Sequence, residues 1–494
     1  MNREHLLAID QGTTSTRAVL FNAQGQAVAS HSVPLAQHYP QPGWVEHNPA
    51  EIWKSTLTCI NRVLHGRNIH ISGIGITNQR ETSVLWDRKT GKPLHRAIVW
   101  QDRRTSPDCA RLKKAGHETT IRKRTGLVLD PYFSGTKLAW LLRNIPGAQA
   151  KARAGRLAFG TIDSWLIWNL TGGKSHVTDP TNASRTMLFN IRKRVWDPAL
   201  AKMLGVPMNL LPEVRPSAGK FGETIRLGAL QAGIPITGVA GDQQAALFGQ
   251  GCIHAGDMKV TYGTGGFLLV HAGSRAGTPR NGLLTTLACG PHGEPAYALE
   301  GSVFIAGAVM QWLRDELGFI KASPESEKIS RSLPDNGGVY IVPAFTGLGA
   351  PWWDAGARGI ITGLTRGSGR AQIVRAAEES IAYQVADVVR AMEKGIGKPI
   401  TELRVDGGAC RDSFLMQFQS DILNARILRP RNTETTAAGA AHLAGLGCGL
   451  WSPTQLAHMH AVDRRFLPRM KPAARKSLLA GWHTAVNRAL TPPS

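Results

Sequence analysis

The organisation of this chain is decided by two short polar stretches, Asp10-Gln11-Gly12-Thr13-Thr14-Ser15 and Tyr262-Gly263-Thr264-Gly265-Gly266, one in each half. Each joins two apolar runs, and these runs are Leu6–Asp10, Arg17–Phe21, Met258–Val260 and Phe267–Val270. Apolar runs around a short glycine-containing stretch are typical of β-hairpins, and the N–H groups of such a turn can bind a phosphate. The spacing alone does not separate a phosphate-binding hairpin from an ordinary one. Two similar hairpins nevertheless predict a duplicated architecture.

Strands alternate with helices in the remainder of both halves. Three further apolar runs each end in a small polar stretch, as strands that lead into functional loops do: Ile71–Ile76, Ile236–Ala240 and Leu403–Val405. This alternation predicts α/β domains built on mixed sheets. The glycine-rich segment 250–256 is the predicted boundary and hinge, so that residues 1–252 form one domain and residues 253–494 the other.

The clearest helix in the sequence covers about Arg370 to Lys394. Its apolar residues recur at steps of three and four from Val374 to Met392, which places them along one face. Because a helix needs such a stripe to pack on a core, we interpret it as structural and not as part of a site. Gly395 is the residue expected to end this helix.

Length and composition indicate a folded protein of several domains. The chain has 494 residues, of which 42% are apolar and 19% are charged, enough for about two to four domains of roughly 100–200 residues each. No run reaches the ~18 apolar residues of a membrane span, and the N-terminal apolar run is too short for a signal peptide. The six cysteines include no close pair, which argues against a zinc ribbon, a redox Cys-x-x-Cys and a disulfide scaffold and favours the cytoplasm.

The net charge of +23 is large for a chain of this length. Such an excess can favour nucleic acids, anionic membranes or anionic metabolites. The cations are spread along the chain, however, and the densest cluster, Arg122-Lys123-Arg124, is short. There is no arginine-rich tail and no basic run interleaved with aromatic residues. We therefore favour a solvated basic surface over nucleic-acid binding, and such a surface would still attract nucleotides.

Several nucleotide-binding and catalytic motifs are missing from the sequence. Gly173-Lys174-Ser175 has the end of a P-loop, but the first glycine of that motif would fall on Trp168. Protein-kinase, His-Glu-x-x-His, Gly-x-Ser-x-Gly and Gly-x-Gly-x-x-Gly motifs are also missing. The sequence contains instead three loops whose small residues leave backbone N–H groups open to an anion, at 10–14, 263–266 and 406–409. Together they favour an ATP site.

Eight blocks of sequence, spread in order over nearly the whole chain, carry a family likeness. The blocks are Asp10–Ser15, Pro42–His47, Gly75–Thr82, Asp130–Lys137, Thr181–Thr186, Gly241–Gly249, Tyr262–Gly265 and Pro343–Pro351. Together they resemble the sugar-kinase family of the actin, hexokinase and heat-shock ATPase superfamily, and within it the members that phosphorylate glycerol. The resemblance implies two actin-like (ribonuclease H-like) domains with mixed sheets flanked by helices and an active site in the cleft between them.

The resemblance also assigns roles to individual residues. It implies that glycerol is bound by Arg80, Glu81, Trp100, Tyr132, Asp242, Gln243 and Phe267, with Asp242 as the catalytic base. It implies that the nucleotide and its phosphates are bound by Thr13, Thr14, Ser15, Arg17, Thr264, Gly307, Gln311, Gly408 and Asp412, with Asp10 beside Mg²⁺. Asp412 departs from the family pattern, which usually has asparagine there.

The activity implied by the resemblance is ATP-dependent phosphorylation of glycerol to sn-glycerol 3-phosphate, the first step of glycerol catabolism. Residues 1–252 would bind glycerol and phosphate, and residues 253–494 the nucleotide. The implied partners are glycerol and MgATP, with no nucleic acid and no membrane span, in a cytoplasmic homo-oligomer that is a dimer or a tetramer.

Other interpretations of the same residues stay open. A kinase for a pentulose or another small polyol would share the fold, and an actin-like or chaperone-like ATPase would have no small-molecule acceptor. A nucleic-acid-binding protein is the third alternative. Taken alone, Arg80-Glu81 would be interpreted as a surface ion pair, and Asp242 as a helix cap.

Regulation is the last expectation. Some bacterial members that this chain resembles carry an arginine in a glycine-rich loop that binds fructose 1,6-bisphosphate. The corresponding loop here, 228–234, contains no arginine, and Arg226 precedes it. Because a bisphosphate needs cationic donors, we expect weak or absent inhibition by this compound.

Overall fold

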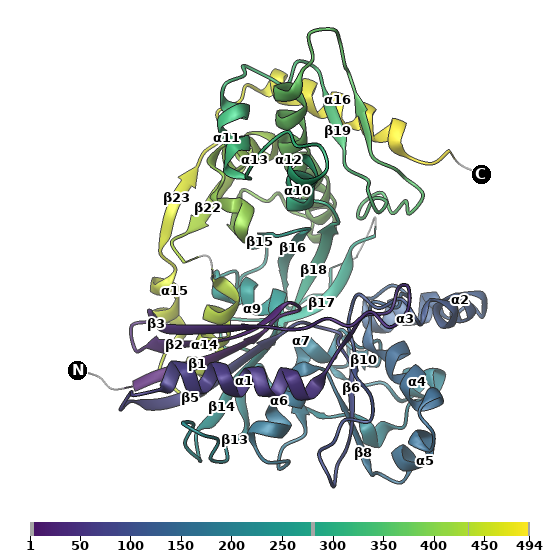
Figure 1. Cartoon of the computed structure of the whole chain (residues 1–494), viewed down its shortest axis with the longest axis vertical. Coiled ribbons are helices and arrows are strands. Elements are labelled where there is room, and N and C mark those ends of the chain that lie inside the picture. Colours follow the sequence, from purple (N-terminus) through teal and green to yellow (C-terminus); the bar gives the residue numbers. More distant parts are fainter. Residues whose placement is uncertain (1–3, 278–281, 433, 493–494) are drawn as a thin grey trace.

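The computed structural model describes residues 4–277, 282–432 and 434–492, which form two lobes, each built on a mixed sheet (Figure 1). The sheet of the first lobe has six strands: β1 (Glu4–Gln11), β2 (Ser15–Asn22), β3 (Ala27–Pro34), β5 (His70–Asn78), β13 (Ala218–Glu223) and β14 (Pro235–Gly241). The sheet of the second lobe has seven: β15 (Met258–Tyr262), β16 (Gly266–Gly273), β17 (Leu284–Cys289), β18 (Pro295–Val303), β21 (Glu402–Asp406), β22 (Arg426–Pro430) and β23 (Val462–Phe466).

The two sheets repeat one topology. The first has the order β3-β2-β1-β5-β14-β13, and the second has β18-β16-β15-β21-β22-β23, with β17 added outside β18. In both, the first two pairings are antiparallel, the next two are parallel and the last is antiparallel. The two hairpins occupy equivalent places, at β1–β2 and β15–β16. The predicted duplication and the predicted strands are thus confirmed.

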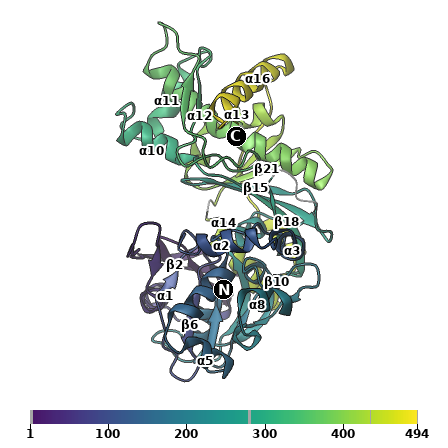
Figure 2. The same cartoon turned by 90° about the vertical axis from the view of Figure 1, so that its right-hand side faces the viewer.

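Helices cover both sheets and fill the part of the first lobe that lies beyond its sheet (Figures 1 and 2). In the first half they are α1 (Pro49–Leu64), α2 (Ser106–Lys114), α3 (Glu118–Thr125), α4 (Ser134–Asn144), α5 (Ala148–Arg153), α6 (Ile162–Leu170), α7 (Pro180–Ala183), α8 (Pro198–Leu204) and α9 (Asp242–Gly249). In the second half they are α10 (Gly307–Asp315), α11 (Pro324–Arg331), α12 (Arg370–Ile396), α13 (Ser413–Leu423), α14 (Thr435–Gly447), α15 (Pro453–Met459) and α16 (Pro472–Ala489).

Short elements make up the rest of the regular structure among the described residues. Five two-stranded ladders pair β4 (Glu46–His47) with β7 (Ala97–Ile98), β6 (Val84–Asp87) with β8 (Leu157–Gly160), β9 (Val177–Thr178) with β12 (Glu213–Val214), β10 (Phe189–Asn190) with β11 (Val195–Trp196), and β19 (Tyr340–Val342) with β20 (Ile360–Thr362). Two 3₁₀ turns, η1 (Met208–Leu210) and η2 (Gly408–Arg411), lie in the first and second halves. Within the described ranges, no helix is both long enough and apolar enough to cross a membrane.

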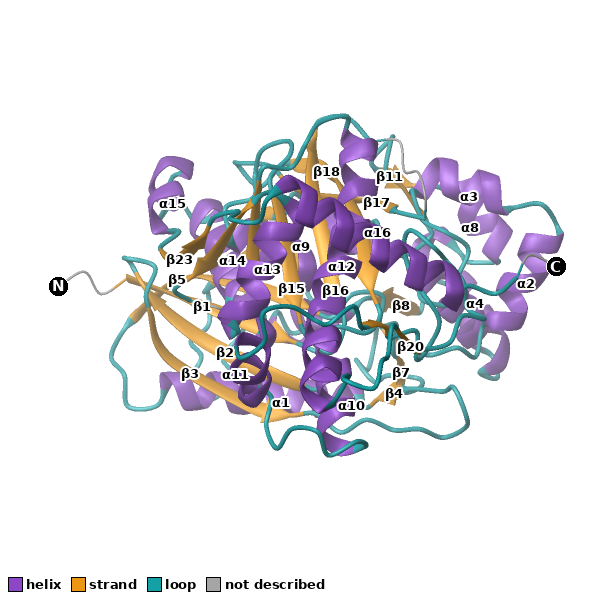
Figure 3. Cartoon of the chain, turned by 90° about the horizontal axis from the view of Figure 1, so that it is seen from above, coloured by secondary structure: helices purple, strands orange, loops and turns teal. Residues whose placement is uncertain are grey.

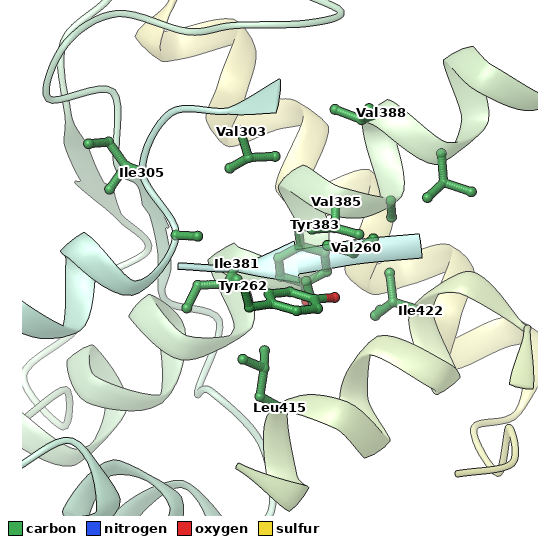
Figure 4. Close-up of a cluster of buried hydrophobic side chains, with 14 of the residues drawn as sticks. Val260, Tyr262, Val303, Ile305, Ile381, Tyr383, Val385, Val388, Leu415 and Ile422 are labelled. Atoms are coloured by element: carbon green, nitrogen blue, oxygen red, sulfur yellow. The ribbon is translucent and has the colours of Figure 1, made fainter. Parts of the chain in front are cut away.

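Helix α12 forms the centre of the second lobe's core, as its apolar stripe predicts. Figure 3 looks down on this helix where it lies over the sheet. Figure 4 shows Ile381, Val385 and Val388 of α12 in one cluster with Val260 and Tyr262 of β15. The structural interpretation of the stripe is therefore confirmed.

The predicted end of α12 is wrong by two residues. The helix continues through Gly395 to Ile396, and Gly397 follows it with φ of 74° and an N–H that donates to the carbonyl of Glu393. A helix C-cap of this kind needs a left-handed backbone, which glycine adopts without a steric penalty. Gly395 has no such φ and is tolerated inside the last turn.

Helix α14 returns from the second half of the sequence to the first lobe. It packs on β1, β5, β14 and α9, and Thr237 Oγ1 donates to the carbonyl of Ala444 at 2.9 Å. The approach is so close that a side chain at Gly75 or Gly238 would collide with the backbone of α14. The two lobes are therefore interlocked, and position along the chain does not by itself assign a residue to a lobe.

Candidate functional site

The loop that follows β5 lies directly beside the first hairpin. The backbone N–H of Gln79 donates to the carbonyl of Gln11 at 2.7 Å, and Gln79 Nε2 donates to Gln11 Oε1 at 3.0 Å. Strands β1 and β5 are parallel neighbours, so their carboxyl ends meet at one edge of the sheet. The fold thus places the predicted phosphate-binding loop, residues 10–14, beside the loop that carries Arg80 and Glu81. We call this second loop the acceptor loop, because its residues are predicted to bind the substrate that accepts the phosphate.

Arg80 is buried in this loop and is held by carboxylates from two other elements. Its Nε faces Asp242 Oδ1 at 3.2 Å, at the start of α9. Its Nη1 and Nη2 face Glu300 Oε2 at 2.5 Å and Glu300 Oε1 at 3.1 Å, on β18. Arg80 is only 3% exposed and Glu81 only 1%. The surface ion-pair interpretation of these two residues is therefore wrong.

Glu81 adopts an unusual backbone conformation beside Arg80. Its φ is 61°, in the left-handed region that non-glycine residues rarely occupy. Its carbonyl accepts a hydrogen bond from Ser134 Oγ at 2.9 Å, and its Oε1 faces Arg185 Nε at 2.5 Å. Strain of this kind persists where the surroundings hold a residue in place, which is common at binding sites. Burial raises the pKa of Glu81, and the Arg185 and Arg80 charges oppose this rise.

Aromatic rings connect the acceptor loop to the first hairpin. Trp100 Nε1 donates to Thr13 Oγ1 at 2.9 Å, and the Trp100 ring meets the Tyr132 ring edge-on, with 5.4 Å between centroids. Tyr132 in turn contacts Phe133. Phe267 lies on β16, opposite Thr261. Among the described residues, its ring takes no part in the contacts that join Trp100, Tyr132 and Phe133. The fold therefore brings two of the three predicted acceptor-site aromatics into contact.

Gln243 is oriented by a buried lysine. Lys259 Nζ donates to Gln243 Oε1 at 2.5 Å and to Thr261 Oγ1 at 2.7 Å. Since the amide oxygen of Gln243 is used in this way, its NH₂ group remains as the donor for a ligand. Burial lowers the pKa of Lys259, and the Asp406 and Asp242 charges oppose that effect.

Asp10 lies at the end of β1, opposite Arg17 on β2. Burial and the charge of Asp242 raise the pKa of Asp10 to about 7, although the Arg17 charge acts in the opposite direction. A buried carboxylate that lies near a second negative charge is a place that a cation would stabilise. Arg17 itself forms an ion pair with Glu434, just before α14.

The remaining residues of the first hairpin are held mainly by backbone contacts. The N–H of Gly12 donates to the carbonyl of Ser15 at 2.9 Å, which closes the turn. The carbonyl of Thr14 accepts from the N–H of Leu35 at 2.9 Å, and the Thr14 side chain is exposed. The hydroxyl of Thr14 is therefore on the surface of the turn.

The second hairpin contacts the start of α10. The carbonyl of Gly263 accepts from the N–H of Gly307 at 2.9 Å, and the carbonyl of Thr264 accepts from the N–H of Ala306 at 2.9 Å. Gln311 lies one turn further along α10 and is exposed. Three of the predicted nucleotide-side residues, Thr264, Gly307 and Gln311, lie in this part of the second lobe, and the fold brings Thr264 and Gly307 into contact.

The third loop follows β21, which pairs with β15 in the centre of the second sheet. Gly407 has φ of 86°, and Gly408 begins the 3₁₀ turn η2. Asp412 caps α13: its Oδ1 accepts from the N–H groups of Phe414 and Leu415, both at 2.9 Å. One oxygen of Asp412 is thus committed to the helix.

Arg185, Glu300 and Lys259 contact the predicted site residues Glu81, Arg80 and Gln243, and the sequence reasoning missed all three. Arg185 lies within a block that carried the family likeness, but no role was assigned to it. Glu300 and Lys259 are the charged residues of strands that are otherwise uncharged and mostly apolar. A lone charge inside an apolar strand is a signal that could have found them, because a buried charge needs a partner.

Comparisons with known proteins agree with this geometry. Models of the FGGY family of carbohydrate kinases match residues 5–249 (N-terminal domain) and 258–448 (C-terminal domain). A glycerol kinase of Symbiobacterium thermophilum is 57% identical over 493 residues, covering 99% of both chains. One of Halorhodospira halophila is 54% identical, covering 99% of this chain and 97% of its own. The crystal structure of Plasmodium falciparum glycerol kinase with ADP superposes with a TM-score of 0.95 at 37% identity, covering 99% of each chain.

Proposed function

Since the chain belongs to the FGGY family of carbohydrate kinases, we propose that it phosphorylates glycerol with MgATP, giving sn-glycerol 3-phosphate and ADP. This reaction is the first step of glycerol catabolism. The observation that carries the proposal is the buried Arg80–Glu81 loop, in a chain whose full-length relatives are glycerol kinases.

Acceptor binding follows from the residue types in this loop. Glycerol is small and neutral, and its hydroxyls need both donors and acceptors. Arg80 would donate, Glu81 would accept, and Tyr132 and the NH₂ group of Gln243 would complete the polar contacts. The rings of Trp100 and Phe267 would lie against the carbon atoms and would exclude acceptors with a different shape.

Asp242 is the proposed catalytic base. It begins α9 and faces Arg80 Nε, which would hold the carboxylate in the direction of the reacting hydroxyl. Phosphoryl transfer passes through a loose transition state, so alignment and charge neutralisation do most of the work. The carboxylate would orient the hydroxyl and accept its proton late in the reaction.

The nucleotide side follows the duplicated frame. The turn of the first hairpin and Arg17 on β2 would bind the transferred phosphoryl group. The second lobe would bind the rest of the nucleotide. Residues 1–252 are thus the proposed glycerol and phosphate side and residues 253–494 the proposed nucleotide side. The residues proposed for the nucleotide are Thr13, Thr14, Ser15, Arg17, Thr264, Gly307, Gln311, Gly408 and Asp412.

Asp10 is the residue proposed to lie beside the Mg²⁺ of MgATP. Among residues 4–277, 282–432 and 434–492, no three His, Cys, Asp or Glu side chains form a group that could hold a metal. Mg²⁺ usually needs only one or two carboxylates, because substrate phosphates and waters supply the other ligands. The raised pKa of Asp10 marks a place where a cation would relieve repulsion with Asp242, so the residues fit the ion. When bound, the ion neutralises phosphate charge.

A coupled assay of ADP release tests the proposal. The purified protein is supplied with MgATP and with glycerol, xylulose or no acceptor. Glycerol should raise ATP consumption far above the other two arms. A preference for xylulose would assign the protein to pentulose phosphorylation, and equal turnover in all arms would indicate an ATPase without a small-molecule acceptor.

Location and assembly are proposals as well. We propose a cytoplasmic enzyme that assembles as a homodimer or homotetramer. Sedimentation velocity of the purified protein would measure the assembly directly, and a single species of monomer mass at micromolar concentration would contradict this proposal.

A further inference from the structure

A buried ion-pair network continues behind the acceptor loop, beyond the residues to which the proposed function gives a role. Two of the three guanidinium nitrogens of Arg80 face the carboxylate of Glu300, and the third faces Asp242. Glu300 is 3% exposed. A bidentate pair of this kind fixes the orientation of a guanidinium as well as its position. The direction of Arg80 is therefore set by Glu300.

Arg185 extends the network to Glu81. Its Nε faces Glu81 Oε1 at 2.5 Å, and its Nη2 faces Glu300 Oε1 at 3.0 Å. The side chain is fully buried, and its guanidinium lies 5.2 Å from the centroid of the Phe133 ring. Glu300 therefore pairs with two arginines. Arg80 is itself proposed to bind glycerol, and Arg185 pairs with Glu81, which is also proposed to bind glycerol.

The carboxylate that joins the two arginines comes from the other lobe. Glu300 lies on β18 of the second sheet, whereas Arg80 follows β5 of the first sheet and Arg185 follows α7, which packs on β14 of that sheet. A two-lobed kinase must align an acceptor on one lobe with a phosphate donor that the other lobe helps to bind, and small misplacements reduce the rate strongly. A charge-assisted contact between the lobes, one side chain away from the acceptor, is suited to that alignment.

We propose that Glu300 and Arg185 are positioning residues of the acceptor site. Glu300 orients Arg80, Arg185 orients Glu81, and the shared carboxylate ties the acceptor loop to the second sheet. This inference rests on the proposed function, because it requires Arg80 and Glu81 to bind the acceptor. It adds an inter-lobe element that makes acceptor binding depend on the relative position of the lobes.

The test uses two variants and one control in the full-length protein. Glu300→Gln keeps the shape of the side chain but replaces one acceptor oxygen with a donor, so it cannot pair with both arms of Arg80. Arg185→Lys keeps the charge and loses the fork. Tyr297→Phe is the control, because Tyr297 lies on the same strand and its hydroxyl donates across the lobes to the carbonyl of Ile191 at 2.9 Å, outside the network.

Steady-state kinetics with each substrate varied in turn gives the readout. In Glu300→Gln and Arg185→Lys, KM for glycerol should rise about tenfold to a hundredfold, while KM for ATP changes less than about twofold. The preference for glycerol over 1,2-propanediol should shrink, because an unoriented Arg80 no longer distinguishes a missing hydroxyl. Tyr297→Phe should keep the wild-type glycerol KM. Melting curves establish that each variant is folded.

Two kinetic results would overturn the inference. One is a folded Glu300→Gln protein with the wild-type glycerol KM, and the other is an equal rise in both KM values. If Glu300→Gln does not fold, Arg185→Lys decides the question; loss of fold in both, with a normal control, would make the network a stability element only. Wild-type protein without glycerol-dependent ATP use would instead refute the proposed function, which separates the two failures.

Discussion

The two hairpins have the same place in the same sheet topology but different chemistry. The first, at β1–β2, lies among charged side chains, since Asp10 is the last residue but one of β1, Arg80 lies in the loop after β5, and Asp242 directly follows β14. The second, at β15–β16, has only glycine and threonine between Tyr262 and Phe267. A neutral polyol must be held by side-chain donors and acceptors, whereas a polyphosphate can be held by backbone N–H groups if nothing bulky is in the way. The two hairpins thus share one sheet topology and differ in the side chains that surround them.

Asp242→Asn should have the largest effect, and it should reduce turnover without weakening nucleotide binding. Asparagine keeps the shape and can still orient the acceptor hydroxyl, but it cannot accept the proton, so kcat should fall by about 10²–10⁴-fold. Nucleotide affinity should survive, because the proposed nucleotide contacts lie elsewhere. Turnover and equilibrium nucleotide binding are measured on the same preparation. Asp315→Asn, an exposed acid at the end of α10, is the matched control and should leave kcat unchanged. A folded Asp242→Asn protein with nearly wild-type kcat would refute the assignment.

An acceptor that lacks one hydroxyl tests the charged surroundings of the first hairpin by changing the ligand instead of the protein. With 1,2-propanediol, a buried partner at Arg80 or Glu81 is left unpaired, at a cost of roughly 1–3 kcal/mol. The value of kcat/KM should therefore be about 5- to 150-fold lower than with glycerol. Both acceptors are compared at saturating ATP. Equal values would mean that Arg80 and Glu81 do not read two hydroxyls.

Gly408→Ala tests whether the nucleotide is bound by backbone N–H groups in the loop that follows β21. A methyl group at this position meets no protein atom within 4 Å, so the fold should tolerate it. It would still stand in the path of an approaching phosphate or nucleotide, and nucleotide affinity should fall about tenfold while the melting temperature stays the same. The neighbouring Gly407 is the contrast, because its φ of 86° and the nearby Tyr262 backbone make Gly407→Ala destabilising. Unchanged affinity in Gly408→Ala would remove this loop from the nucleotide site.

Fructose 1,6-bisphosphate should have the smallest effect. The 228–234 loop has no arginine, and the N–H of Ala229 already donates to Asn61 Oδ1 at 2.8 Å, which leaves few donors for a bisphosphate. Turnover of glycerol should stay within about twofold of its uninhibited rate at millimolar ligand. Strong inhibition at sub-millimolar ligand would mean that another basic residue, such as Arg226, takes the place of the missing one.

Local sequence patterns predicted most of the frame. The hairpins, the strands that precede the functional loops and helix α12 follow from apolar periodicity and glycine-containing turns, and the structure confirms them. The error at Gly395 has a local cause as well: two glycines lie near the end of α12, and only the backbone conformation distinguishes the one that caps it. Family likeness named the predicted site residues, and the fold brings Arg80, Asp242, Trp100 and Tyr132 into one neighbourhood.

By itself, the sequence determined the duplicated α/β frame, because periodicity and turn residues act over a few neighbouring positions. Only the tertiary structure decided which charges are paired. Glu300 is separated from Arg80 by 220 positions in the chain, and α14 crosses from the second half to cover the first sheet. No local pattern encodes such contacts, since the free energy of a buried charge depends on the partner that the whole fold brings to it. The sequence therefore identifies individual residues of the acceptor site, whereas the ion pairs that join them are known only from the folded chain.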